Sequence, residues 1–442
     1  MIKEFQVTEL DIVMCLCGAK DLIDPALVNH HKRVACIASA VGEELGLEPG
    51  RINELILGGA LHDIGAFTTR ERLAVKSFDC GDIEHAEPGY RLLNGFGPFS
   101  SVADVIRRHH VDWEDGAGAH VDGHEVPELS FIVHLADRVD VLINPAFEIL
   151  SQRDDICARI MEGSGGKFVP RHVKAFLSLA GRDSFWFDVV SHSVCRVIER
   201  RVRPAPVRLD LEGLSELSRL VSHVVDFRSP YTVTHSSGVA ACASQLARAM
   251  SFSPRECRMI EIAGRLHDLG KLAVPDEILD KEGSLTEYEV NLIKAHPYHT
   301  FRILDTLPAL ETITAWASFH HERLDGDGYP FGHDGEVLSL GSKVLAVADV
   351  FTALTEERPY RQAMSNTMAL RCIDAMVEER ALDPSVFSVL KHNLDDVLDA
   401  MLTAQAEAEN AYHSIDAAAQ DLCGRAPRRA ASLRRRCGRS IM

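Results

Sequence analysis

The sequence predicts an all-α protein that consists of two tandem copies of one helical unit. Three observations support this fold class. Matched motifs occur twice in the same order along the 442 residues, helix start signals precede apolar-periodic segments, and alternating β-branched runs with hairpin turns are scarce. With 46% hydrophobic residues, a chain of this length can build two or three buried cores.

Six pairs of matched blocks define the two copies. The pairs are "NHHKRVACIA" with "THSSGVAACA", "GGALHDIGA" with "AGRLHDLGK", "HAEPGYRLL" with "HPYHTFRIL", "RRHHVDWEDG" with "SFHHERLDG", "VHLADRVDVL" with "LAVADVFTAL", and "FVPRHVKAFL" with "LDPSVFSVLK". The spacing agrees as well, since 32 positions separate His30 from His62 and His235 from His267. We interpret this regularity as an internal duplication of a unit of roughly 200 residues.

The domain boundaries follow from breaks in the helical pattern. We expect an N-terminal copy over residues 1–203, a C-terminal copy over residues 204–405 and an Arg-rich tail over residues 406–442. Two prolines and a basic cluster in "RRVRPAPVRLD" mark the join. The tail includes "GRAPRRAASLRRRCGRSIM" and has no core pattern, so it is predicted to be solvated and disordered at its end, with docking to an anionic partner as the alternative.

The segment "SPRECRMIEIAGRLHDLGK" shows how the helices are predicted. Ser253 with Glu256 makes a capping box, and Pro254 suits the first helical turn. Three residues then share the inward face: Ile260, Ala263 and His267. Gly270 is expected to end the regular pattern. This periodicity turns a histidine toward the core.

Composition excludes several classes of protein. The formal net charge of −18 argues against binding to duplex nucleic acid. Charges interrupt the apolar runs before they reach the length of a membrane span. Acidic residues in "MIKEFQVTELDIVMCLCG" occupy the place of a signal-peptide core, which indicates a cytoplasmic protein. The eleven cysteines include no CxxC pair, so we expect small buried side chains rather than disulfides.

The second copy contains histidines and aspartates that together suit a metal centre. They are His235, His267, Asp268, His296, His320, His321 and Asp349. Any one of them alone could be a hydrogen-bonded core residue, but the set recurs in both copies. Imidazole with carboxylate suits Fe, Mn, Co, Ni or Zn, and the absence of cysteine disfavours a structural zinc site. Seven ligands fit two metals about 3.5–4 Å apart, with Asp268 as the natural bridge.

This pattern, H…HD…H…HH…D, resembles the HD superfamily of metal-dependent phosphohydrolases. The second copy resembles the HD-GYP branch over roughly residues 214–390, through "YTVTHSSGVA", "LHDLGK", "HHERLDGDGYP" and "VADVFTALTEERPYR". The first copy, over roughly residues 22–179, resembles a generic HD domain. The resemblance implies an all-α fold and hydrolysis of a cyclic dinucleotide, chiefly cyclic di-GMP, with some members acting on 3′3′-cyclic GMP-AMP.

The same resemblance implies roles for single residues. One metal would take His235, His267, Asp268 and Asp349, and the other would take Asp268, His296, His320 and His321. Iron or manganese is favoured, with Ni, Co or Zn as alternatives. Asp268 and Lys271 are the implied catalytic residues, and four side chains would contact substrate: Lys271, Arg358, Arg361 and Tyr329. The two arginines would stand one turn apart if their segment is helical. The family's usual Asp after Asp349 is Thr352 here.

The first copy keeps the ligands but not the cations of the second. Its equivalent ligands are His30, His62, Asp63, His85, His109, His110 and Asp137, with His31 as an alternative to His30. Lys271 is replaced by Ala66, the place of Arg358 is Ala146, and the GYP loop becomes "EDGAGAH". We therefore predict a regulatory or scaffolding copy, which could contact a signalling partner protein or a second chain. The alternative is a second hydrolase with smaller substrates.

Three functions compete at this point. The leading one is a cyclic-dinucleotide phosphodiesterase that gives a linear dinucleotide or mononucleotides. A hydrolase of linear nucleotides is disfavoured by the GYP loop and "RPYR". A non-catalytic adaptor that binds a cyclic dinucleotide is disfavoured by the complete ligand set and by Lys271. The residues do not distinguish between the two cyclic dinucleotides, because recognition of the bases depends on loop geometry.

Overall fold

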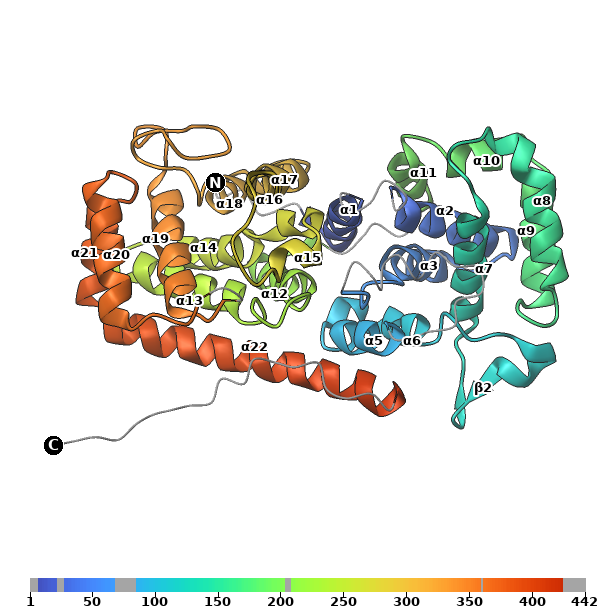
Figure 1. Cartoon of the computed structure of the whole chain (residues 1–442). Coiled ribbons are helices and arrows are strands. Elements are labelled where there is room, and N and C mark those ends of the chain that lie inside the picture. The colour runs from blue at the N-terminus through green and yellow to red at the C-terminus, as the bar shows by residue number, and fades with distance from the viewer. Residues whose placement is uncertain (1–6, 22–27, 68–84, 203–207, 359–360, 424–442) are drawn as a thin grey trace.

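The protein is almost entirely helical. The structure is a computed structural model that describes residues 7–21, 28–67, 85–202, 208–358 and 361–423. Figure 1 shows its helices as two bundles that lie side by side. The predicted all-α, tandem organisation is therefore confirmed. None of the helices in these ranges combines the length and the apolar character that crossing a membrane requires.

The two copies consist of the following helices. The first copy contains α1 (Glu9–Lys20), α2 (His30–Glu44), α3 (Pro49–Leu61), α5 (Ala86–Asn94), α6 (Ser100–Arg107), α7 (Glu128–Leu142), α8 (Ile149–Glu162), α9 (Pro170–Ala180), α10 (Asp183–Val189) and α11 (Val194–Arg201). The second copy contains α12 (Leu211–Asp226), α13 (His235–Ala249), α14 (Pro254–Leu266), α15 (Asp276–Leu279), α16 (Glu287–Lys294), α17 (His296–Leu304), α18 (Glu311–Ser318), α19 (Leu340–Thr355), α20 (Asn366–Glu378), α21 (Pro384–His392) and α22 (Leu394–Cys423). Short 3-10 helices add η2 (Gly97–Phe99), η3 (Glu114–Ala119), η4 (Leu269–Ala273) and η5 (Pro308–Leu310).

Strands in the described ranges are only two residues long. β1 (Val7–Thr8) pairs antiparallel with β4 (Arg208–Leu209), and β2 (His120–Val121) pairs antiparallel with β3 (His124–Glu125). The first pair matters for the architecture, because β1 immediately precedes α1 and β4 lies just before α12. The segments that open the two copies therefore meet each other directly.

The helix start predicted at Ser253 is confirmed. The Ser253 hydroxyl accepts from the backbone of Glu256, the Glu256 carboxylate accepts from the backbone of Ser253, and Pro254 opens α14. The expected end of this helix is wrong, because α14 stops at Leu266 and Gly270 lies in the 3-10 helix η4. Gly270 is required for a different reason: a Cβ there would overlap the carbonyl oxygen of His296. The glycine allows a close backbone approach that brings two ligand-bearing segments together.

Helix α1 lies between the two copies and contacts both. The Cys17 thiol donates to the carbonyl of Ala60 in α3 at 3.5 Å, whereas the Cys15 thiol donates to the carbonyl of Ile303 in α17 at 3.6 Å. Consistent with the expectation for reduced thiols, eight cysteines are free: Cys15, Cys17, Cys36, Cys157, Cys195, Cys242, Cys257 and Cys372. The N-terminal helix therefore joins the first copy to the second.

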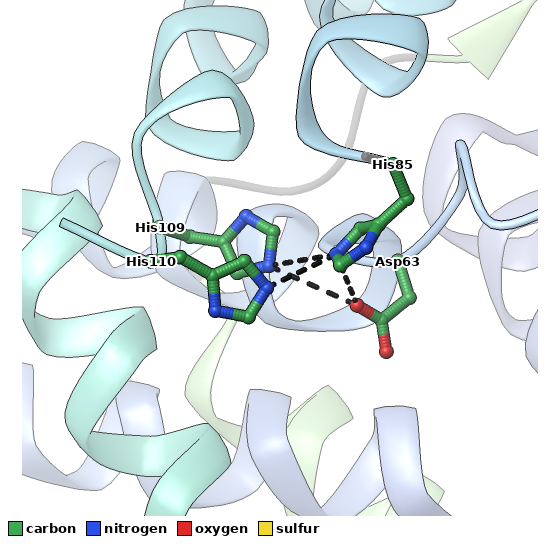
Figure 2. A group of neighbouring side chains, drawn as sticks. All are labelled: Asp63, His85, His109 and His110. Carbon is green, nitrogen blue, oxygen red and sulfur yellow. Dashed lines mark hydrogen bonds and ion pairs between the residues drawn. The ribbon is translucent and has the colours of Figure 1, made fainter. Parts of the chain in front are cut away.

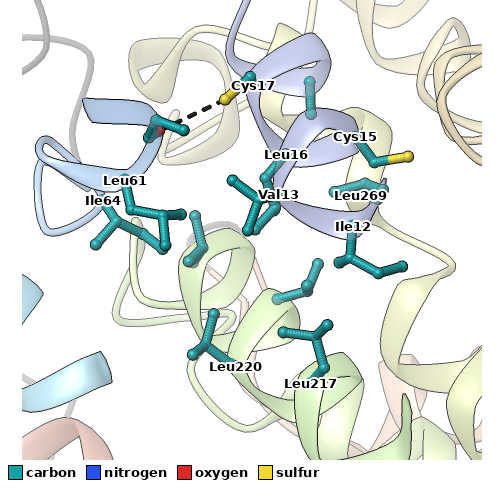
Figure 3. Packing of buried hydrophobic residues seen from close by; sticks show 14 of the residues in the cluster. Ile12, Val13, Cys15, Leu16, Cys17, Leu61, Ile64, Leu217, Leu220 and Leu269 are labelled. Atoms are coloured by element: carbon teal, nitrogen blue, oxygen red, sulfur yellow. Dashed lines mark hydrogen bonds between the residues drawn. The ribbon is translucent and has the colours of Figure 1, made fainter. Parts of the chain in front are cut away.

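The apolar face of α1 packs close to both His-Asp motifs (Figure 3). Leu16 is 4% exposed and lines one small cavity together with Leu217 of α12 and Leu269, the residue after Asp268. Full burial of a leucine contributes about 1.5–3 kcal/mol relative to exposure. This shared core anchors the 3-10 helix that follows Asp268.

Helix α22 runs along both bundles (Figure 1). It packs against α13 of the second copy and reaches α5 of the first, where the guanidinium of Arg91 donates to the carbonyl of Ser414 at 2.9 Å. The boundary expected at residue 405 falls inside this helix, which continues to Cys423. Residues 424–442 of the predicted tail lie outside the described residues. The helix connects the two copies on the side away from α1 (Figure 1).

Candidate metal centre

Helix ends, together with Asp349 in the interior of α19, bring the seven predicted ligands of the second copy to one place. The ligands are His235, His267, Asp268, His296, His320, His321 and Asp349. His235 and His296 are the first residues of α13 and α17, and His267 directly follows α14. All seven side chains are buried except that of His321, which is 28% exposed. The site therefore lies inside the bundle and is reached from the side of His321.

Asp268 stands between two groups of histidines. Its Oδ2 lies 3.3 Å from Nε2 of His267 and 3.7 Å from Nε2 of His235. Its Oδ1 lies 3.2 Å from Nε2 of His296, which is itself 3.2 Å from Nε2 of His320. One carboxylate thus presents each of its oxygens to a different set of imidazoles, as a bridging ligand must.

Asp349 completes one side of the site. Its Oδ1 lies 3.3 Å from Nε2 of His235 and 3.7 Å from Nε2 of His267, while its Oδ2 lies 4.0 Å from Nδ1 of His321. Three groups of potential ligand atoms each fit within 4.8 Å: His235, His267 and Asp268; His296, His320 and His321; His267, His320 and Asp349. The donor atoms therefore form overlapping groups, each of which could hold a metal ion.

The backbone orients three of the imidazoles. His267, His296 and His320 each hydrogen-bond through Nδ1 to the carbonyl three residues earlier, at 2.7 Å in each case. A proton on Nδ1 leaves the lone pair on Nε2, and in this site Nε2 faces the aspartates. This arrangement is the one in which imidazole binds a metal.

The electrostatics of the site suit metal binding. Burial lowers the pKa of His320 well below 6.5 and that of His321 to about 3, so both rings are neutral. Burial alone would raise the pKa of Asp268, but His267 and Lys271 lower it well below 3.8. Buried Oδ1 of Asp268 nevertheless has no hydrogen bond. A buried carboxylate oxygen without a donor is costly, and a divalent cation would satisfy it.

The first copy gathers an equivalent cluster, part of which is drawn in Figure 2. Asp63 again divides its oxygens, with Oδ2 3.0 Å from Nε2 of His62 and Oδ1 3.0 Å from Nε2 of His85. Nε2 of His85 lies 3.4 Å from that of His109 and 3.1 Å from that of His110. Several ligand atoms here are buried without a hydrogen bond: Nε2 of His30 and His62, both oxygens of Asp63, and Oδ1 of Asp137. Because these buried ligand atoms lack hydrogen bonds, as Oδ1 of Asp268 does, the first copy also suits a metal ion.

Two HD-domain profiles match the chain, one over residues 27–142 and one over residues 219–386. The chain belongs to the HD-domain family. HD domains bind divalent metal ions, and the matched ranges contain the His and Asp clusters of both copies. The predicted tandem HD organisation is thus confirmed.

Known relatives of this HD-domain protein are bacterial phosphodiesterases. It is 29% identical to 3′3′-cGAMP-specific phosphodiesterase 1 of Vibrio cholerae, over 88% of this chain and 93% of that protein. It is 41% identical to the cyclic di-GMP phosphodiesterase PA4108 of Pseudomonas aeruginosa, over 36% of this chain and 38% of that protein. A crystal structure of a cyclic GMP-AMP-specific phosphodiesterase of V. cholerae (V-cGAP3) has the same fold, with a TM-score of 0.63, 24% identity, and coverage of 89% of this chain and 98% of that one.

The residues expected to contact substrate differ in their surroundings. Nζ of Lys271 lies 2.5 Å from Oδ2 of Asp268, and the ring of Tyr329 stacks on His321 with centroids 4.9 Å apart. Arg358 and Arg361 are not on a helix, because α19 ends at Thr355 and the two form an antiparallel bridge. Position 359 is proline, which disfavours helical backbone at the residue before it. Lys271 and Tyr329 thus border the histidines directly.

The two arginines make different contacts. Nη2 of Arg358 lies 3.4 Å from Oε2 of Glu356, beside the site. The guanidinium of Arg361 instead donates to the carbonyls of Leu354 and Ala353, at 3.2 and 2.6 Å, and so caps the end of α19. Arg358 therefore lies beside His235, whereas Arg361 is engaged with the end of α19.

A buried glutamate holds the GYP loop in place. Glu322 is 2% exposed, and its carboxylate accepts from the backbone N–H groups of Phe331 and His333 at 2.7 and 2.9 Å. The backbone N–H of Tyr329 also donates to the carbonyl of His321 at 3.2 Å. These bonds fix the loop against the segment that contains His321 and Glu322. The motif itself did not indicate Glu322.

Sequence reasoning also missed the partner of His235. Its Nδ1 lies 2.8 Å from Oε2 of Glu356, and Oε1 of Glu356 accepts from Nε2 of Gln405 in α22 at 2.7 Å. Glu356 follows Asp349 by seven positions, two helical turns, so the helical period could have revealed it. Nothing near Gln405 in the sequence points to this site.

Two buried cations in the first copy were not expected. The guanidinium of Arg138, 1% exposed, donates to Oδ2 of Asp137 at 2.5 Å, and Nζ of Lys20, 4% exposed, donates to the carbonyl of Asp63 at 2.9 Å. They lie at other positions than Ala66 and Ala146, so the predicted lack of counterparts to Lys271 and Arg358 is not contradicted. His31 is buried next to His30, with its Nε2 3.9 Å from Oδ2 of Asp63. Both cations are almost fully buried, whereas the side chain of Lys271 is 17% exposed.

Proposed function

We propose that the second copy of this protein is a metal-dependent phosphodiesterase that hydrolyses a cyclic dinucleotide. The geometry of Asp268 carries the proposal. Its two oxygens face different histidines, at 3.2 Å from His296 and 3.3 Å from His267, and Lys271 stands beside the same carboxylate. A buried set of imidazoles and carboxylates, next to the partly exposed lysine Lys271, suits the hydrolysis of a phosphate ester.

The ligand set fits two divalent ions. One would be held by His235, His267, Asp268 and Asp349, and the other by Asp268, His296, His320 and His321. Iron or manganese is favoured by the mixture of imidazole and carboxylate without thiolate, and Ni, Co and Zn fit the same donors. When bound, the ions would supply a water nucleophile and stabilise charge on the phosphate oxygens.

The protein's own groups bind and orient the phosphodiester. Lys271, whose side chain is 17% exposed, is placed to neutralise a phosphate oxygen at the edge of the buried cluster. Arg358 offers a planar guanidinium next to His235, with its Nη2 3.2 Å from Nδ1 of that ring. Tyr329, in the GYP loop, stacks on the ring of His321 and borders the site. Together these groups fix the scissile phosphate next to Asp268, and the product is a linear dinucleotide or, after a second cleavage, mononucleotides.

The substrate favoured by the comparisons is 3′3′-cyclic GMP-AMP. The relative specific for this compound matches over 88% of the chain and so covers both copies, whereas the cyclic di-GMP enzyme matches over only 36%. The longer match supports 3′3′-cyclic GMP-AMP as the substrate. Cyclic di-GMP is the alternative substrate to be compared directly.

The first copy has a regulatory or scaffolding role in this proposal. It retains ligand geometry around Asp63, but Ala66 stands where the second copy has Lys271. Without a cation that is available to a phosphate, this pocket would stabilise a phosphodiester poorly. In this role, the first copy would receive a regulatory signal by contact with a signalling protein or with a second chain.

Product analysis tests the function. The purified full chain is incubated with 3′3′-cyclic GMP-AMP or cyclic di-GMP under Mn²⁺ or anaerobic Fe²⁺, and products are separated by chromatography. We expect linear products that appear faster from 3′3′-cyclic GMP-AMP and disappear in Asp268→Ala. Tight binding of a cyclic dinucleotide without any product in either metal would instead favour the adaptor. Cleavage of linear nucleotides alone would favour an HD nucleotide phosphohydrolase.

A further inference from the structure

We propose that Glu356 and Gln405 are positioning residues that hold His235 for metal binding, and that Gln405 makes helix α22 part of the second-copy centre. The inference rests on the proposed metal site. It comes from a comparison of the two copies, which support the same histidine in two different ways. Gln405 lies outside the motifs that identify the domain, and Glu356 lies within "VADVFTALTEERPYR" but received no role from it.

In the first copy, an aspartate one turn after the ligand Asp137 holds the histidine. Oδ2 of Asp140 lies 2.6 Å from Nδ1 of His30. The guanidinium of Arg33, on the same helix as His30, bonds to both oxygens of Asp140, with Nη2 3.1 Å from Oδ2. Histidine, aspartate and arginine therefore form one chain of contacts behind the ligand.

The second copy lacks both supporting side chains at the same positions. Thr352 follows Asp349 by three positions, as Asp140 follows Asp137, and Gly238 is the fourth residue of α13, as Arg33 is of α2. The Thr352 hydroxyl is buried and makes no hydrogen bond. It therefore does not replace the aspartate.

Glu356 supplies the missing carboxylate from the end of α19. It accepts from Nδ1 of His235 at 2.8 Å, and its side chain is 10% exposed. Nε2 of Gln405 donates to its other oxygen at 2.7 Å, in the role that Arg33 has in the first copy. The carboxylate lies one helical turn further along the chain than in the first copy, and it is contacted by Gln405 of α22 at 2.7 Å and by Nη2 of Arg358 at 3.4 Å.

Gly238 makes room for this arrangement. A Cβ at this position would lie 2.8 Å from Nε2 of Gln405 and 3.0 Å from Cγ2 of Thr352. A side chain here would push the amide of Gln405 away from Glu356. Glycine at position 238 and the contact from Gln405 to Glu356 therefore depend on each other, because a side chain at position 238 would occupy the space of the Gln405 amide.

The consequence is that the metal centre depends on α22. A carboxylate on Nδ1 fixes the ring orientation and tautomer of a metal-binding histidine, and removal of such a partner costs about 10–100-fold in metal affinity. The same helix is tied to the first copy through the bond from Arg91 to the carbonyl of Ser414. The position of His235 is therefore linked to the docking of α22 across both bundles.

Metal binding, measured apart from activity, tests the inference. Purified full-length variants are titrated with Mn²⁺, and bound metal is determined by elemental analysis together with the thermal unfolding midpoint of the metal-free protein. We expect Glu356→Ala to bind one of the two ions about 10–100-fold more weakly. Gln405→Ala should show a smaller loss in the same direction. Thr403→Ala, an exposed change on the same helix, is the matched control and should bind like wild type.

A rescue variant separates positioning from general stability. Thr352→Asp in the Glu356→Ala background restores a carboxylate at the place where the first copy has Asp140, and we expect it to recover most of the lost metal affinity. Two ions bound by Glu356→Ala with wild-type affinity would overturn the inference, as would a rescue variant no better than Glu356→Ala. A wild-type protein that binds no metal at all would instead overturn the proposed function, so the two failures are distinguishable.

Discussion

Arg138 donates to Oδ2 of Asp137 at 2.5 Å inside the first copy, where the second copy has Val350 next to Asp349. The pair is almost fully buried, with side chains 1% and 2% exposed. One oxygen of the ligand is thereby occupied by the protein's own cation. The first copy keeps the ligands of an HD domain, but its charges are balanced internally rather than left for a phosphate.

This difference predicts unequal roles for the two copies. The double variant His62→Ala with Asp63→Ala should still hydrolyse substrate in the second copy. Its rate should change by no more than a coupling of about 1–3 kcal/mol between the two sites allows. The mirror variant, His267→Ala with Asp268→Ala, should be inactive. Initial rates with 3′3′-cyclic GMP-AMP compare them. Equal residual activity in both would identify a protein with two hydrolytic sites.

The bridging position of Asp268 leads to a prediction about metal content. Asp268→Ala should lose both ions and all hydrolysis, because its two oxygens serve both groups of histidines. The helical fold should remain, since apolar helix faces close the core around the site. Elemental analysis and circular dichroism measure the two effects. Full metal content with normal turnover would end the dinuclear proposal.

Lys271 should affect chemistry rather than metal binding. Its amine is placed at the edge of the site beside Asp268, so Lys271→Ala should lower kcat/KM by about 10–1000-fold, as for other positioned charges, with both ions retained. Lys391→Ala, a change at a half-exposed lysine of α21, is the control for the loss of one charge. A normal rate with every cyclic dinucleotide would exclude this role for Lys271.

The sequence predicted the parts of the site that recur. Histidines at matched spacing indicated which side chains cluster in each copy, and Ser253 marked a helix start, because both signals are local and occur in short motifs. The contacts that support the ligands are not local. Gln405 reaches the site from a helix far along the chain, and Lys20 reaches Asp63 from α1. Such contacts depend on how helices pack, which spacing within one segment does not encode.

A buried aspartate beside the site predicts a pH effect on stability. Burial raises the pKa of Asp226 to about 8, and the carboxyl accepts from the hydroxyl of Ser236 at 2.9 Å. Because the folded pKa exceeds the unfolded value of about 3.9, wild-type stability falls as pH rises between these values, by up to ~1.4 kcal/mol per pH unit. Asp226→Asn has no charge to bury, so its stability relative to wild type should increase up to pH 8.

Denaturant unfolding at pH 5, 7 and 9 measures this difference. The control is Asp305→Asn, which changes an exposed carboxylate on the protein surface, and its unfolding free energy should follow that of wild type at every pH. A constant difference between Asp226→Asn and wild type across the three values would show that Asp226 is charged in the folded protein.

The close approach at Gly270 gives the last prediction. A Cβ there would overlap the carbonyl oxygen of His296 and lie 2.8 Å from the backbone nitrogen of Thr300, so Gly270→Ala must displace the start of α17. Overpacking of this kind costs about 1–3 kcal/mol, and here it also moves a ligand. We expect a lower unfolding midpoint and weaker Mn²⁺ binding. Gly50→Ala, in the first turn of α3 with open space around its Cβ, should be neutral or slightly stabilising, because alanine favours helix. Wild-type metal affinity in Gly270→Ala would show that α17 shifts without moving His296.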